Sequence, residues 1–161
     1  MMFSVGCWGL TGFMSNMLDF AYGQGQVKYV ISMEGAKDAP GVEWRRITSP
    51  IIVPFIATIG FAFIWVSKFL TGVLCLYGSA RMFISRKEDT ATFAAAKEWG
   101  LLGCGISVVM LFLGFIVITG QYFAYWRVPV LGMITHDYAF FYLLSLTGFL
   151  LFLQSPEGEP K

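Results

Sequence analysis

The chain has 161 residues, of which 57% are hydrophobic and 13% charged, about half the charged fraction of a typical soluble domain. A domain of this size buries only about two-thirds of its surface, so these apolar side chains cannot all be hidden from water, and we expect an integral membrane protein. A net charge of +1 excludes the basic field that gathers nucleic acid, and a single histidine argues against a multi-histidine zinc site or a bis-histidine haem.

Four long apolar runs predict four membrane-spanning helices. A helix needs about 20 mostly apolar residues to cross the hydrocarbon core. The runs show no period-two alternation, and open strand edges are unstable in lipid. We therefore expect an all-α integral membrane four-helix bundle that forms a single domain. The predicted spans cover approximately residues 1–19, 51–80, 99–124 and 137–154, and the polar connections cover 20–50, 81–98 and 125–136.

The first span ends in two polar residues. Asn16 and Asp19 are three residues apart, a spacing that places both on one helix face. The Asp19 carboxylate could cap the helix, bind the Arg45–Arg46 pair or meet a cation of a neighbouring subunit. Among these roles we favour a structural salt bridge.

The connection 20–50 is long for a loop, which indicates a structure of its own. Within it, Val27, Val30 and Ile31 follow a helical spacing beside polar residues. This pattern predicts a short helix along the membrane surface, between the first two spans. The alternative, to which we give equal weight, is that the connection 20–50 only joins the first two spans.

Aromatic and basic residues mark the expected membrane–water boundary. Trp44 and Trp126 lie where amphipathic rings favour the interface. Arg45 and Arg46 precede the second span and could contact anionic lipid, at about 1 kcal/mol per charge. Simple interfacial anchoring is the other interpretation of this pair.

Lys68 interrupts the second apolar run. A lysine at the bilayer centre costs about 2.5–3.5 kcal/mol, and such residues are functional by default. The run 51–80 is about 45 Å long as a helix, so a lysine two-thirds along it could snorkel to a headgroup. Snorkelling or a salt bridge to a partner subunit is the favoured interpretation, and an ion or proton pathway is the alternative.

Small residues recur at intervals of four in the second and third spans, including Thr71 and Cys75, and Gly103 and Ser107. This spacing lets membrane helices approach closely. The three cysteines lie in apolar runs without a C-x-x-C pair, so we interpret them as small hydrophobic residues.

His136 and Asp137 begin the fourth span. A histidine beside an acid could titrate near neutral pH, ligate a metal or hydrogen-bond a quinone near Trp126. We favour the simpler interpretation, in which the carboxylate complements the dipole of the helix N-terminus.

Several segments resemble one known family. Asn16–Asp19, Val27–Glu34 and Trp44–Pro50, followed by Leu70–Gly78 and Gly120–Phe123, are similar to predicted small integral membrane proteins of domain-of-unknown-function family 2165. The resemblance covers nearly the whole chain. It implies a prokaryotic-type four-helix membrane protein with an ordered first connection, and it implies no activity.

The chain departs from that family pattern at three positions. The family has His where Tyr29 stands and Glu where Lys68 and Gln121 stand. These differences identify a divergent member whose intramembrane ionisable groups have been replaced. Any family chemistry that rests on those groups does not carry over to this chain.

We expect no enzymatic activity, because the spans offer no catalytic, cofactor-binding or metal site. The leading hypothesis is a non-catalytic accessory subunit of a larger membrane complex, of the respiratory kind, with membrane lipids and other subunits as partners. One alternative is a small self-associating transporter built around Lys68, and another is a quinone- or lipid-binding module. The candidate lipid or partner contacts are Asn16, Asp19, Trp44, Arg45, Arg46, Lys68, Trp126 and His136.

The expected location is a bacterial inner membrane or a mitochondrial inner membrane. A four-span topology places five Lys or Arg residues on each side, so the positive-inside rule is balanced. Basic residues crowd the helix end at 81–87, which favours termini on the cytoplasmic or matrix side.

Overall fold

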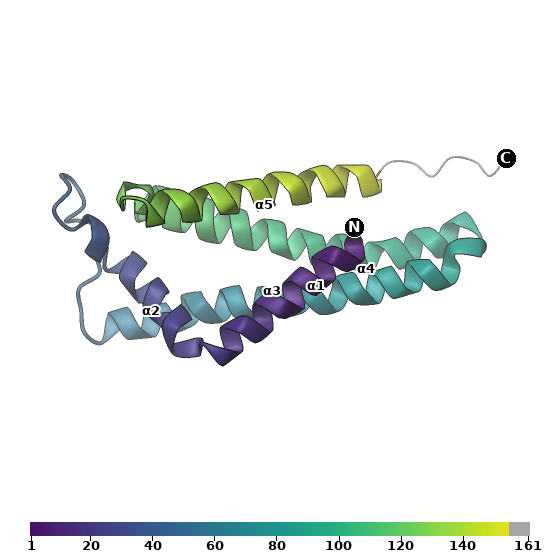
Figure 1. Ribbon diagram of the computed structural model, residues 1–161, viewed down its shortest axis with the longest axis horizontal. Coiled ribbons are helices and arrows are strands. Elements are labelled where there is room, and N and C mark those ends of the chain that lie inside the picture. Colours follow the sequence, from purple (N-terminus) through teal and green to yellow (C-terminus); the bar gives the residue numbers. More distant parts are fainter. Residues whose placement is uncertain (155–161) are drawn as a thin grey trace.

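The computed structural model describes residues 1–154, and every regular element in that range is helical (Figure 1). The segments η1, η2 and η4 are single 3₁₀ turns, and η3 is a π-helix that continues α4. The elements in chain order are α1 (Met2–Leu18), α2 (Phe20–Ile31), η1 (Glu34–Ala36), α3 (Ile52–Ile84), η2 (Ser85–Lys87), α4 (Thr90–Val109), η3 (Met110–Tyr122), η4 (Tyr125–Arg127) and α5 (Leu131–Gln154).

Three helical segments of the described chain are long and apolar enough to cross a membrane: α3 with η2, α4 with η3, and α5. They correspond to the second, third and fourth predicted spans. The first predicted span corresponds to α1, which has 17 residues and is therefore shorter than the roughly 20 residues of a typical span. Beyond it, Asp19 turns the chain, and α2 follows immediately.

The central helix of the fold is α3. On one side it packs against α1 and α2, and on another side against α4. The fifth helix lies along α4 and η3, away from α2 (Figure 1). The N-terminal end of α1 reaches α4, because the Met2 side chain lies between Gly78 and Gly100.

The predicted short surface helix is instead a 12-residue helix that packs along α3. The Gln24 amide donates to the Thr58 hydroxyl at 2.6 Å, and farther along α2 the Ile31 side chain joins a buried cluster with Val53 and Ala57. Residues later in α2 thus meet residues earlier in α3, so the two helices are antiparallel. The apolar face that predicted a membrane-surface helix is buried against α3.

The helices extend beyond the predicted spans at the other end of the molecule. The predicted polar connection 81–98 is reduced to a tight turn around η2, because α3 continues to Ile84 and α4 begins at Thr90. The Asp89 carboxylate accepts a hydrogen bond from the Thr92 amide at 2.6 Å, which satisfies a donor of the first turn. The charged residues of this segment therefore lie on helix ends.

Candidate functional site

The contact between α1 and α3 is built from glycines. A Cβ added at Gly9 would lie 2.6 Å from the amide nitrogen of Gly72, and one added at Gly6 would lie 2.7 Å from Cγ of Leu76. Only glycine lets the backbones approach this closely. This glycine stripe was not predicted, although the spacing of Gly6, Gly9 and Gly12 is visible in the sequence.

Lys68 lies at the end of this glycine stripe. A Cβ at Gly12 would lie 3.1 Å from Cδ and 3.3 Å from Nζ of Lys68, so the lysine stem and its ammonium group cover α1 at this point. The side chain is half-buried. Among residues 1–154, no carboxylate forms an ion pair with Lys68.

A second unpaired donor lies one turn before Lys68. The Trp65 indole stacks on Phe13 of α1, with ring centroids 5.0 Å apart. Its Nε1 is buried and has no acceptor within the described part of the chain. Because residues three apart share a helix face, Trp65 and Lys68 present two hydrogen-bond donors to the same side of α3.

The contact between α3 and α4 contains polar groups that satisfy one another. The Thr71 hydroxyl lies 2.8 Å from that of Ser107 and 3.1 Å from the carbonyl oxygen of Gly103, and the thiols of Cys75 and Cys104 are 3.7 Å apart. All four side chains are fully buried. The small residues of the second and third predicted spans therefore form the interhelical seam that their spacing indicated.

The two arginines before α3 contact the protein itself. Arg45 donates to the carbonyl oxygens of Gln121 and Tyr122, both at 3.3 Å, at the end of η3. Arg46 donates to the carbonyl of Ser32 at 3.1 Å. The predicted pairing of Asp19 with these arginines is not formed. Asp19 is the C-cap residue of α1, and its amide donates to the carbonyl oxygen of Ser15 at 3.1 Å.

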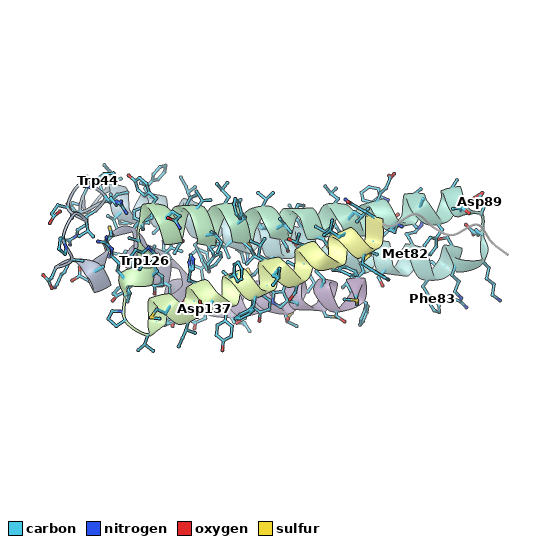
Figure 2. The ribbon with its side chains drawn as sticks, turned by 90° about the horizontal axis from the view of Figure 1, so that it is seen from above. Trp44, Met82, Phe83, Asp89, Trp126 and Asp137 are labelled. Atoms are coloured by element: carbon cyan, nitrogen blue, oxygen red, sulfur yellow. The ribbon has the colours of Figure 1, made fainter. Side chains whose placement is uncertain are left out.

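Two tryptophans gather with these arginines at one end of the molecule, whereas Asp89 lies at the opposite end (Figure 2). The Trp44 and Trp126 rings are exposed, at 68% and 49%. Each has an arginine guanidinium over its face, Arg45 at 4.6 Å and Arg127 at 5.2 Å. This end therefore presents cation–π pairs of the kind that suit a membrane interface.

The His136 ring packs against Gly120 of η3, where a Cβ would overlap it. Asn16 and His136 are both half-buried. Within residues 1–154, no group of three or more His, Cys, Asp or Glu side chains is placed to hold a metal ion. The eight candidate residues thus fall into separate regions of the molecule, and Lys68 is the one at the centre of a span.

Comparison with known proteins identifies one family. The family model described as "Predicted small integral membrane protein (DUF2165)" matches residues 1–156, so the chain belongs to that family. No curated protein and no solved structure matches the chain.

Proposed function

We propose that this member of the family is a non-catalytic subunit of a larger membrane assembly, and that Lys68 binds an acidic side chain of a partner subunit. The observation that carries the proposal is an intramembrane cation without a mate among the described residues of its own chain. Ionised side chains within a bilayer pair with one another or line a water-filled path. A partner carboxylate beside α1 and α3 would supply the missing acceptor.

Lys68 lies near the middle of the helix. It is 13 residues before Arg81 and 16 residues after the start of α3 at Ile52, which corresponds to about 20 Å and 24 Å along the helix. If Lys68 instead snorkels to a headgroup, the Lys68→Met variant described below keeps its partner.

The interior of the molecule supports a non-catalytic role. The buried hydroxyls of Thr71 and Ser107 bond to each other and to Gly103, so they do not converge on a substrate. A transporter needs a continuous set of polar groups across the span. A transporter that uses Lys68 is therefore the second candidate function. The Lys68→Met variant tests the subunit and the transporter hypotheses together.

The test is purification of the tagged chain from its native membrane in mild detergent, followed by mass spectrometry of the proteins that co-purify. For Lys68→Met we expect the co-purified partner to fall at least about tenfold, because one unpaired buried charge costs about 3–5 kcal/mol. Lys68→Arg keeps the charge and is expected to retain most of the partner. Lys87→Met, which makes the same change at an exposed position, is the matched control.

Two outcomes would overturn the proposal. One is a wild-type protein that migrates alone or only as a homo-oligomer. The other is a Lys68→Met variant that keeps a stoichiometric partner. Loss of ion flux in proteoliposomes by that variant, with normal folding, would instead establish the transporter.

A further inference from the structure

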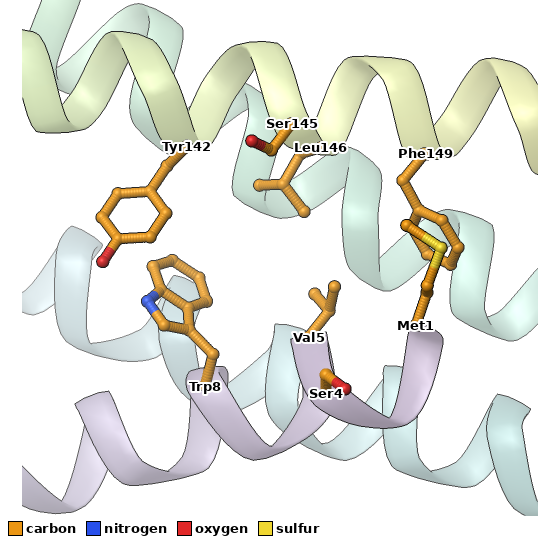
Figure 3. A pocket seen from close by; sticks show the side chains of 8 residues that line it. All are labelled: Met1, Ser4, Val5, Trp8, Tyr142, Ser145, Leu146 and Phe149. Carbon is orange, nitrogen blue, oxygen red and sulfur yellow. The ribbon is translucent and has the colours of Figure 1, made fainter.

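A cavity of about 300 Å³ separates α1 from α5 (Figure 3). At one end the rings of Trp8 and Tyr142 meet, with centroids 5.5 Å apart. At the other end Met1 and Phe149 line the cavity (Figure 3). Met1 and Trp8 are seven positions apart, which corresponds to about 10 Å of helix, so the cavity is short.

The cavity lies beside helices that are long and apolar enough to cross a membrane. The α1 residues that line it are on the same helix as Gly6 and Gly9, which contact Leu76 and Gly72 of α3. In the middle of the cavity, Val5 and Leu146 form the walls (Figure 3). Most of the lining side chains are apolar or aromatic, so we take lipid hydrocarbon as the surrounding medium.

Size and polarity select the occupant. A helix has a diameter of about 10–12 Å with its side chains, so even a short length of a helix from a partner or a second copy is larger than this space of about 300 Å³. A buried water needs two to four polar partners, whereas six of the eight lining side chains are apolar or aromatic, with Ser4 and Ser145 as the exceptions. An empty apolar cavity loses the dispersion contacts of its lining. A slender, flexible hydrocarbon chain meets all three conditions.

We infer that the cavity binds one acyl chain of a membrane phospholipid, which fills the space where α1 and α5 do not pack closely against each other. The aromatic rings at the two ends contact the chain, and Val5 and Leu146 contact its middle. The bound chain connects the short α1 to the rest of the molecule on the side away from α3. This inference does not depend on the partner subunit proposed for Lys68.

The test combines retained lipid with a matched pair of variants. Ser145 lines the cavity and is exposed, so Ser145→Trp places a bulky ring in the space without removing a core side chain. Leu144 is also exposed but does not line it, so Leu144→Trp is the control. After the same detergent wash, we expect mass spectrometry to find one phospholipid per chain in the wild type and in Leu144→Trp, and a loss of that lipid in Ser145→Trp.

The site itself is located by cross-linking. The full chain is reconstituted in dioleoylphosphatidylcholine vesicles that contain a phosphatidylcholine with a diazirine on one acyl chain. We expect adducts in the peptides that carry Trp8 and Leu146, and weaker labelling of those peptides in Ser145→Trp. Retention of lipid by a folded Ser145→Trp, or labelling spread evenly over all helices, would overturn the inference. Recovery of an isoprenoid quinone in place of a phospholipid would also overturn the acyl-chain assignment.

Discussion

Arg45 closes the end of η3 from a distance of 76 residues in the chain. The last carbonyl groups of a helix lack partners within the helix, and Arg45 donates to two of them, at Gln121 and Tyr122. Both bonds come from one guanidinium nitrogen, Nη1. The pair that the sequence suggested for lipid headgroups therefore also holds the connection 32–50 against the end of η3.

Replacing Arg45 tests this capping role. We expect Arg45→Met to lower the free energy of unfolding by about 1.5 kcal/mol, the lower end for hydrogen bonds to a charged group, because both bonds are 3.3 Å long. Arg45→Lys should restore part of this loss, since a single nitrogen, Nη1, makes both bonds and an ammonium group also carries a charged donor. Thermal unfolding in detergent measures the change. Equal stability of Arg45→Met and the wild type would contradict the capping role.

Asp89 gives the start of α4 a pH dependence. Hydrogen bonds from the side chain of Thr92 and from its backbone amide hold the pKa of the Asp89 carboxyl below its usual range. A lowered pKa in the folded state stabilises the cap above the unfolded pKa, and this contribution is lost as the pH falls through the lowered value. We expect the protection of the Thr92 amide against hydrogen exchange, relative to the intrinsic exchange rate at each pH, to fall in acid. In Asp89→Asn, which keeps a capping oxygen, that acid-dependent loss of protection should disappear, and its persistence would point to another group.

At the scale of elements, the sequence predicted the positions of the helices better than it predicted which helices pack against each other. Hydropathy alone identified α3, the α4–η3 segment and α5, because lipid exposure demands long apolar runs. The packing of α2 against α3 was not predicted, because an apolar helix face can contact either lipid or protein. The hydrogen bond from Arg45 to Gln121 joins residues that are 76 positions apart in the chain, so no local pattern could predict it.

The glycine stripe of α1 yields an element-scale prediction. In Gly9→Ala the new methyl group would press on the backbone of Gly72, and overpacking of this kind costs about 1–3 kcal/mol. In Gly25→Ala the methyl group enters open space on α2, so the better helix propensity of alanine should add roughly 0.5–1 kcal/mol. Thermal unfolding of the two variants is expected to shift in opposite directions. Shifts in the same direction would show that Gly9 is not a close-packing position.

The whole molecule is polarised along its long axis. Trp44 and Trp126 mark one end, and Asp89 marks the other (Figure 2). Of the eight residues singled out from sequence, Lys68 alone has an unpaired group at the centre of a predicted span. The position of Lys68 within a span could be predicted from the sequence. The lack of a carboxylate beside it could not, because that depends on how the helices pack together.

The two ends should face opposite sides of the membrane. Glu43 and Glu88 are exposed at these ends, and each can be replaced by cysteine and labelled with an impermeant maleimide in intact cells or vesicles. We expect exclusive labelling of Glu43→Cys and Glu88→Cys from opposite sides, with Glu88→Cys on the cytoplasmic or matrix side. Labelling of both from the same side would contradict a transmembrane arrangement of α3.

The glycine contact between α1 and α3 also sets an order of events during synthesis. Gly9 and Gly72 are 63 residues apart in the chain, so at translation rates of about 5–20 residues per second the first helix waits roughly 3–13 s for its partner. During that interval its glycine face has no helix to meet, and its 17 residues are short for independent insertion. The N-terminal helix therefore reaches its final place only after α3 has left the ribosome, and biogenesis depends on holding the nascent chain until then.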